Sequence, residues 1–188
     1  MILLVVNFLL VGLLPVIFFR RDGKFNFNWF LTAIPFLLAS IVIVLAWTNL
    51  LETALPQSSL LLKFIQLMAI PVSVSSVTLL SMTVGVHRIP LALWHQDNDD
   101  AVELVTWGTY SKIRHPFYSS FLLYFLAVIL AFPHWLTVGL FVYSATALSI
   151  TARREERRLK ASEFGGKYVE YMKSTGRFFP PLQNISRD

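Results

Sequence analysis

The chain of 188 residues contains no cysteine. Disulfides, thiolate metal sites and cysteine nucleophiles are therefore excluded. Charged side chains are also scarce, at 14% of the residues against 55% hydrophobic ones. Soluble domains carry roughly 25% charged residues, so this composition is typical of a protein embedded in a membrane. The net charge of +5 comes from residues that flank apolar runs and form no basic groove, which favours membrane lipids over nucleic acid as partners.

Five apolar runs approach the roughly 20 residues that a helix needs to cross a bilayer core. They cover residues 2–19, 29–51, 61–86, 117–132 and 135–152. The second and third runs contain Pro35 and Pro71, where we expect kinks. Only Pro133 and His134 separate the last two runs, which predicts a tight helical hairpin. The sequence therefore predicts an all-α polytopic membrane protein with five transmembrane helices.

Lysine and arginine are enriched in the cytoplasmic loops of membrane proteins. With five spans, fifteen of the 16 Lys and Arg residues fall on one side, and only Lys63 falls on the other. We therefore predict an outside N-terminus and a cytoplasmic C-terminus. The small size and minimal loops indicate the inner membrane of a prokaryote. Residues from Arg153 onward would form a cytoplasmic helix that is broken at Gly165 and Gly166.

The chain divides into three N-terminal helices, residues 1–86, and a second part, residues 87–188, with a polar loop, the hairpin and the C-terminal segment. A hairpin returns to the side that it left, so residues near 115 and 155 should meet at the cytoplasmic surface. Pro116 suits the first turn of a helix whose unpaired N–H groups can hold a carboxylate. Glu155 and Glu156 offer acceptors for ammonium or hydroxyl groups. This combination favours a zwitterionic, sugar-bearing ligand, and the four histidines lack the spacing of a metal site.

Several motifs follow one another between about His95 and Pro180. Residues 108–118 read Gly-x-Tyr-x-x-x-Arg-His-Pro-x-Tyr, residues 155–159 read Glu-Glu-x-x-Leu, and further matches are Phe164-Gly165, Tyr168, Tyr171 and Arg177-Phe178-x-Pro180. In this order the segment resembles the superfamily of isoprenylcysteine carboxyl methyltransferases and phospholipid methyltransferases, which are integral membrane enzymes. The resemblance covers nearly half of the chain, and the first three predicted helices add little to it.

The resemblance implies S-adenosyl-L-methionine as the cofactor, bound at the entry and exit of the hairpin and by the loop before it. The implied cofactor-binding residues are His95, Val102, Glu103, Leu104, Val105, Tyr110, His115, Pro116, Phe117, Tyr118 and Glu155. The cofactor would enter from the cytoplasm, and a lipid-like or prenylated substrate would enter laterally from the bilayer. The active site would therefore face the cytoplasm.

The resemblance also implies catalytic roles for His115, Arg154 and Glu156. Family members that methylate prenylcysteine carboxylates tend to carry a substrate-orienting arginine one turn before the glutamate pair, where this chain has Thr151. Arg153 or Arg154 would take that role from a different direction around the helix. A carboxylate acceptor needs no base, whereas an amine must first lose a proton, for which His115 or a glutamate is the candidate.

More than one function stays open. Carboxyl O-methylation is the main expectation, and the alternatives are amine N-methylation of a phospholipid and a non-enzymatic protein that keeps the scaffold. Simpler interpretations also exist: the arginines can merely orient the protein, His115 can cap a helix, and the glutamates can pair with Arg158 and Lys160 on a solvated face. The serines and threonines of residues 61–86 are interpreted as contacts between helices.

Overall fold

The computed structural model of this chain describes residue 25 and residues 27–86 and 104–181. The predicted first span, residues 2–19, lies outside the described residues. Three of the implied cofactor-binding residues, His95, Val102 and Glu103, also lie outside them.

Five α-helices and one short 3-10 helix make up the described part. In chain order they are α2 (Phe27–Trp47), α3 (Leu60–Val86), η1 (Gly108–Ser111), α4 (Pro116–Ala131), α5 (Trp135–Ala161) and α6 (Gly165–Ser174). Within these residues no β-strand occurs, and one isolated parallel bridge joins Ile113 and Gly176. The predicted all-α class is confirmed.

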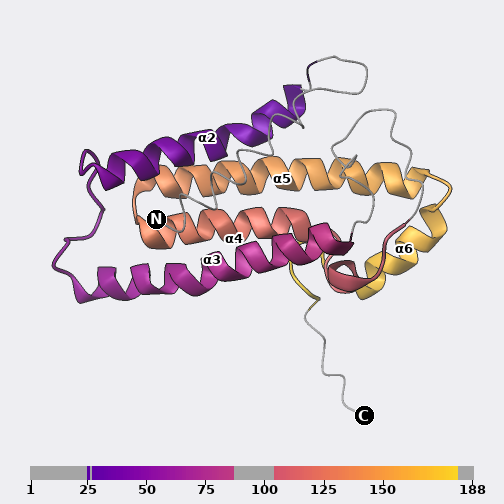
Figure 1. Cartoon of the computed structure of the whole chain (residues 1–188). Helices are drawn as coiled ribbons and strands as arrows, with labels where there is room; N and C mark the ends of the chain where they lie inside the picture. The colour runs from indigo at the N-terminus through magenta and orange to yellow at the C-terminus, as the bar shows by residue number, and fades with distance from the viewer. Residues whose placement is uncertain (1–24, 26, 87–103, 182–188) are drawn as a thin grey trace, which may run out of the picture.

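The long helices α2 to α5 lie side by side in a bundle (Figure 1). α4 packs against both α3 and α5, and α2 packs along α5. Only Phe132, Pro133 and His134 separate α4 from α5, so the predicted hairpin is confirmed. His134 caps α5, because its Nδ1 accepts the N–H of Leu136 at 3.1 Å.

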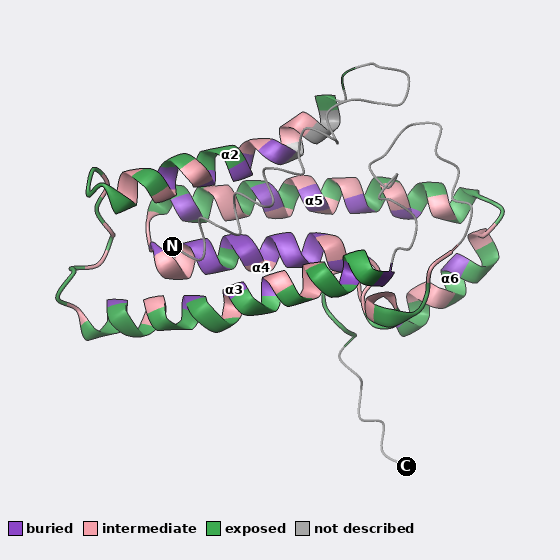
Figure 2. Cartoon of the chain, in the orientation of Figure 1, coloured by how far each residue is buried: buried purple, intermediate pink, exposed green. Residues whose placement is uncertain are grey.

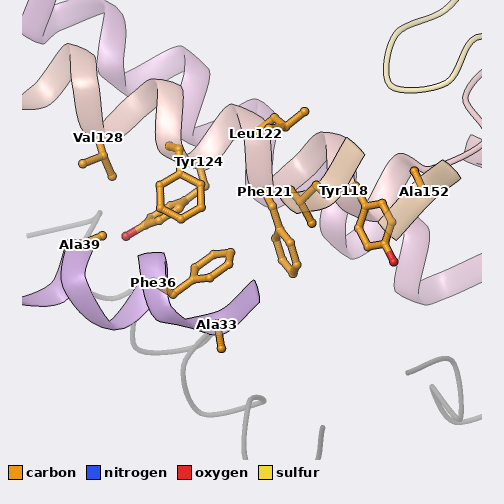
Figure 3. Packing of buried hydrophobic residues seen from close by; sticks show 11 residues of the cluster. Ala33, Phe36, Ala39, Tyr118, Phe121, Leu122, Tyr124, Val128 and Ala152 are labelled. Atoms are coloured by element: carbon orange, nitrogen blue, oxygen red, sulfur yellow. The ribbon is translucent and has the colours of Figure 1, made fainter. Parts of the chain in front are cut away.

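The core centres on α4, which is the most buried helix (Figure 2). Phe36 of α2 lies between aromatic side chains of α4, with its ring centroid 4.8 Å from that of Phe121 and 4.7 Å from that of Phe125 (Figure 3). Tyr124 stacks on the same ring at 5.7 Å. Such offset and edge-to-face contacts add to the gain from burial. They fix α2 against the hairpin.

Pro35 lies inside α2 without ending it. Proline has no N–H, so the carbonyl of Leu31, four residues earlier, loses its partner within the helix. The hydroxyl of Tyr143 in α5 donates to that carbonyl at 3.0 Å. A side chain of the neighbouring helix thus satisfies the acceptor that the proline leaves open, and α2 continues. Pro71 likewise lies within a continuous α3.

The polar side chains of α3 have two different roles. Ser76 donates to the carbonyl of Ser120 in α4 at 2.7 Å, which is the contact between helices that the sequence predicts. Ser73 and Thr83 instead donate to carbonyls one turn earlier in their own helix, each at 2.6 Å. The prediction therefore holds for Ser76, while hydroxyls such as that of Ser73 satisfy their hydrogen-bonding capacity locally.

Two helices, α3 and α5, are long and apolar enough to span a membrane, and the apolar stretches Ala33–Trp47 and Pro116–Ala131 are shorter. Large apolar side chains are exposed on the outer faces of α2, α3 and α5. They include Ile41, Val44, Leu60, Phe64, Leu67, Ile70, Val74, Trp135, Val138 and Val142. An apolar surface of this extent on the described bundle indicates association with a membrane.

The expected break at Gly165 and Gly166 is wrong in its position. α5 continues through its charged end to Ala161, and α6 begins at Gly165. The helix ends earlier because Ser162 accepts the N–H of Phe164 at 3.3 Å and so competes with the helical hydrogen bonds. Gly165 is needed for another reason: a Cβ there would lie 2.3 Å from the carbonyl oxygen of Lys160.

Candidate functional site

Three segments meet at one end of the bundle: the start of α4, the charged end of α5 and the segment after α6. Pro116 is the first residue of α4, where its missing N–H has no cost, as predicted. His115 precedes it as the N-cap residue but makes no capping hydrogen bond with its side chain. The simple interpretation of His115 as a helix cap is therefore wrong. Its imidazole is free to turn toward α5.

His115 and Tyr118 both contact Glu155. The Nδ1 atom of His115 lies 3.0 Å from Oε2 of Glu155, and the hydroxyl of Tyr118 donates to Oε1 of the same carboxylate. The two rings are stacked, with centroids 5.4 Å apart and planes 4° from parallel. The predicted meeting of residues near 115 and 155 is confirmed.

Glu156 is held by two arginines. Arg114 donates from Nε to Oε1 at 3.1 Å, and Arg177 donates from Nε to Oε1 at 3.1 Å and from Nη2 to Oε2 at 2.5 Å. The residue is only 4% exposed. The alternative of a glutamate pair on a solvated face is therefore wrong for Glu156. Buried carboxylates are retained in proteins when they are paired in this way.

The segment after α6 runs beside the segment that enters α4. Three backbone hydrogen bonds join the two segments. The N–H of Arg114 donates to the carbonyl of Gly176 at 2.8 Å, and the N–H of His115 donates to the carbonyl of Arg177 at 3.0 Å. In the other direction, the N–H of Gly176 donates to the carbonyl of Lys112 at 3.1 Å. Ser119 adds a bond to the carbonyl of Phe178 at 2.6 Å. We call residues 175–178 the strap. The strap fixes the backbone of Arg114 and His115, and it also carries Arg177.

Two glycines make these close approaches possible. Gly108 has φ +62°, and a Cβ there would lie 2.5 Å from the Cγ2 atom of Val86 in α3. A Cβ on Gly176 would lie 1.7 Å from the carbonyl oxygen of Phe179. Both positions therefore require glycine, the first for its backbone conformation and both for space. This explains the glycine that opens the motif at residues 108–118.

Three tyrosines surround the ion pairs from the side of η1 and α6, namely Tyr110, Tyr168 and Tyr171. The hydroxyl of Tyr171 donates to the carbonyl of Tyr110 at 2.6 Å and so joins α6 to η1. Burial, followed by the neighbouring Tyr171 and Glu155, raises the pKa of Tyr110 above its ordinary value. Burial raises the pKa of Tyr171 to about 12. These hydroxyls stay protonated and can donate hydrogen bonds near neutral pH.

The charges of the cluster perturb its titrating groups in opposite directions. Burial alone lowers the pKa of His115, but Glu155 and Glu156 outweigh it and raise the pKa above 6.5. Burial alone raises the pKa of Glu156, but His115, Arg177 and Arg114 outweigh it and hold the pKa far below its usual range. Glu156 is thus permanently ionised near neutral pH, and the protonated form of His115 is favoured.

One buried atom of the cluster has no hydrogen bond. Nε2 of His115 lies 3.4 Å from Oε1 of Glu156, near enough for attraction between charges but without hydrogen-bonding geometry. The residue is 7% exposed. A buried polar atom in this state is expected to acquire a partner when a ligand binds.

The structure brings together some of the predicted residues and leaves others apart. Tyr110, His115, Tyr118, Glu155 and Glu156 belong to one cluster. The other predicted residues are placed around or away from it. Pro116 starts α4, Phe117 packs on Phe121, Leu104 and Val105 are half-buried in the loop before η1, and Arg153 and Arg154 are exposed on α5.

Arg114 and Arg177 are the cluster residues that sequence reasoning does not assign to the site. Both are part of the quoted motifs, but a basic residue beside an apolar run is more simply interpreted as an orientation signal. Their common partner, Glu156, could not be inferred from spacing, because the strap is brought to the hairpin only by tertiary contacts. Among the described residues, no group of three or more His, Cys, Asp and Glu side chains could hold a metal ion.

Comparisons with known proteins do not extend these observations. No protein-family model matches this chain, and no curated protein matches it significantly. The resemblance stated above therefore depends on the motifs themselves.

Chemically, the cluster offers a fixed set of groups to a ligand. Glu155 supplies a partly accessible carboxylate, with its side chain 16% exposed. Nε2 of His115 supplies a buried donor, and the ring of Tyr118 stacks on the same imidazole. An anionic acceptor next to aromatic rings suits a positively charged group, and the adjoining donors suit a hydroxyl or a carboxylate. This donor set fits the sulfonium and amino acid portion of S-adenosylmethionine.

Proposed function

We propose that this protein is a membrane-embedded methyltransferase that uses S-adenosylmethionine and acts on a lipid-like or prenylated substrate. In this proposal five helices cross the membrane, the N-terminus is outside, and the charged end of α5 and α6 face the cytoplasm. The membrane-spanning part of α5 ends near Ala152, and the ion pairs lie beyond it.

One observation carries the proposal: three motif segments that are distant in the sequence form a single buried cluster. Arg114, His115 and Tyr118 come from the first motif, the glutamate pair from the second and Arg177 from the third. A protein that used these charges only for orientation would need none of these mutual contacts. Perturbed and mutually paired titrating groups are typical of functional sites.

Within the cluster the two glutamates have different roles. Glu156 is occupied by Arg114 and Arg177 and therefore acts as a positioning residue. Glu155 is held in place by Tyr118 and His115, and its carboxylate would face a cationic ligand. Bound S-adenosylmethionine would supply an electrophilic methyl group on its sulfonium. His115, Tyr110, Tyr118 and Glu155 would hold and orient the ligand, because methyl transfer depends mainly on alignment of the reacting atoms.

The same residues determine which groups could accept the methyl group. A carboxylate acceptor is already ionised, so the site needs to position it and exclude water. An amine acceptor must lose a proton, and Glu155 rather than Glu156 would take it, because His115, Arg177 and Arg114 hold the pKa of Glu156 far below its usual range. Arg154 is exposed on α5 and would reach a substrate only from the membrane surface.

Methyl transfer tests this proposal directly. Membranes with the protein are incubated with S-adenosylmethionine carrying a tritiated methyl group and either a prenylcysteine or phosphatidylethanolamine, and the organic extract is counted. We expect transfer with the wild type and with Glu163→Gln, which changes an exposed residue, and loss with Glu155→Gln. Release of the label as methanol in alkali identifies a methyl ester, whereas an N-methyl group retains it. Wild-type counts equal to those of membranes without the protein would overturn the proposal.

A second candidate is a non-enzymatic membrane protein that keeps the scaffold. It is favoured by the way Glu156 is satisfied by its two arginines, as in a purely structural ion pair. The two candidates predict different results for Glu155→Gln. In the methyltransferase this variant loses affinity for S-adenosylmethionine, whereas in a purely structural protein Glu155 holds no cofactor and the variant changes no such binding.

A further inference from the structure

The charged end of α5 has an inward and an outward face. Leu148, Ala152 and Glu156 follow one another at helical spacing and are buried. Arg153, Arg154 and Arg157 are exposed on the opposite half of the same helix. The acidic and basic residues of this short sequence are therefore separated by the fold.

This separation turns the carboxylate of Glu156 away from the exposed Arg153, Arg154 and Arg157. Glu156 is paired with Arg114 and Arg177, and Glu155 is paired with His115 and Tyr118. In an ordinary surface helix such glutamates would face the solvent and offset neighbouring positive charges. Here Glu156 is buried in the site and Glu155 contacts His115 and Tyr118. Arg153, Arg154 and Arg157 stay exposed on the surface of α5.

The spacing of the basic residues concentrates that charge further. Arg153 and Arg157 are four residues apart, so their like charges are adjacent on one helix face. Pairs of like charge at this spacing destabilise a helix in water. An anion that lies between two such arginines removes the repulsion and gains charge-assisted hydrogen bonds from both guanidinium groups.

The length of α5 sets the depth of these arginines. A hydrocarbon core of about 30 Å takes about 20 helical residues. Counted from Trp135, which is 80% exposed and suited to a membrane interface, those residues end at Arg153 and Arg154. Arg157 lies about one turn further out, at the level of the lipid phosphates. This step rests on the membrane embedding in the proposed function.

We propose that the outward face of α5, formed by Arg153, Arg154 and Arg157, binds the headgroups of anionic phospholipids. Zwitterionic headgroups carry a compensating cation, so an anionic phosphodiester is the preferred ligand. The bound lipid lies against the back of the helix whose front holds Glu155 and Glu156. Lipid composition therefore affects the stability of the helix segment that carries the candidate site.

The test measures thermal unfolding of the full chain in nanodiscs of phosphatidylcholine with or without phosphatidylglycerol. Phosphatidylglycerol should raise the unfolding temperature of the wild type by about 3 °C, since a ligand that binds only the folded state stabilises it. Arg153→Gln with Arg157→Gln should lose most of this rise. The matched control, Lys63→Gln with Lys173→Gln, removes the same charge from exposed positions outside the face and should keep it.

Equal rises in the arginine variant and the control, or no rise in the wild type, would overturn the lipid site. Extraction of native membranes with alkaline carbonate separates this outcome from failure of the embedding. Protein that is released by carbonate does not span the membrane, whatever its response to lipids. Protein that stays in the pellet and shows no dependence on phosphatidylglycerol refutes the lipid site alone.

Discussion

Arg114 donates from its Nε to Oε1 of Glu156 at 3.1 Å, although 42 positions of the chain separate the two residues. This bond joins the start of α4 to the end of α5, and Arg177 brings the strap to the same carboxylate. The hairpin, the strap and the candidate site are therefore stabilised together.

Replacing Glu156 by glutamine should strongly destabilise the protein. The change leaves Arg114, whose side chain is 9% exposed, without its negative partner. Breaking a buried ion pair from one side costs about 3 to 5 kcal/mol. Chemical unfolding in detergent micelles measures the cost. Glu163→Gln is the control, and because its side chain is exposed it should change the free energy of unfolding by less than about 0.5 kcal/mol. A similar small change for both variants contradicts the prediction.

Gly176→Ala should displace the strap. Its Cβ would lie 1.7 Å from the carbonyl oxygen of Phe179, so the backbone that bonds Arg114 and His115 must move. We expect a lower unfolding temperature and weaker ligand binding. Gly166→Ala is a matched control in α6, because nothing lies within 4 Å of its added Cβ. That variant should be as stable as the wild type or slightly more stable, since alanine favours a helix. Equal behaviour of the two variants rules out the proposed role of the strap.

Tyr143→Phe tests the satisfaction of the Leu31 carbonyl. Loss of the 3.0 Å bond should cost about 0.5 to 1.5 kcal/mol of unfolding free energy. In the background of Pro35→Ala the carbonyl can regain a bond within α2, so the same change should cost less. Unfolding measurements on the single and double variants give this difference. If the cost is the same in both backgrounds, the hydroxyl does not compensate for the proline.

Stability should depend on pH through His115. Its folded-state pKa is raised above 6.5 by Glu155 and Glu156, so the folded protein binds this proton more tightly than the unfolded chain. The resulting stabilisation is fully present below pH 6.5 and is lost as the pH rises through the raised pKa. Unfolding temperatures measured from pH 5.5 to 9 should fall more for the wild type than for His115→Gln. Parallel curves for the two proteins contradict the assignment.

Glu156 should make the stability depend on pH in the opposite direction, with a loss as the pH falls. Its folded-state pKa is held far below 4.5, so its contribution is present above pH 4.5 and is lost as the pH falls through the lowered pKa. Acid unfolding of the wild type followed by circular dichroism should begin below pH 4.5. In Glu156→Gln this component should be missing, and a preserved acid transition of equal size would assign it to other carboxylates.

The sequence predicts the fold well where one physical rule dominates. Hydropathy locates α2 to α5, and Pro133 with His134 marks the hairpin turn. The hairpin in turn correctly predicts that His115 and Glu155 meet, because its geometry requires it. The sequence predicts the break after the charged helix at Gly165 and Gly166, but α5 ends at Ala161. The side chain of Ser162 competes there with the helical hydrogen bonds, an effect that hydropathy does not register.

The site is predicted less completely than the fold. The glutamate pair appears in the sequence as two equivalent neighbours, yet adjacent helical residues point about 100° apart and meet different partners. Glu156 faces the two arginines, whereas Glu155 faces His115 and Tyr118. Arg177 joins Glu156 only because the strap runs beside the start of α4, and no local pattern encodes that contact.

The most direct test of the central claim is calorimetric titration of S-adenosylmethionine into the purified full chain in detergent. We predict saturable binding by the wild type and by Glu163→Gln, and a loss of at least about tenfold in affinity for His115→Ala and Glu155→Gln, equivalent to about 1.4 kcal/mol. Circular dichroism confirms that each variant keeps its helices. Equal affinity in all four proteins would place the cofactor elsewhere, and no binding by the folded wild type would contradict the methyltransferase proposal.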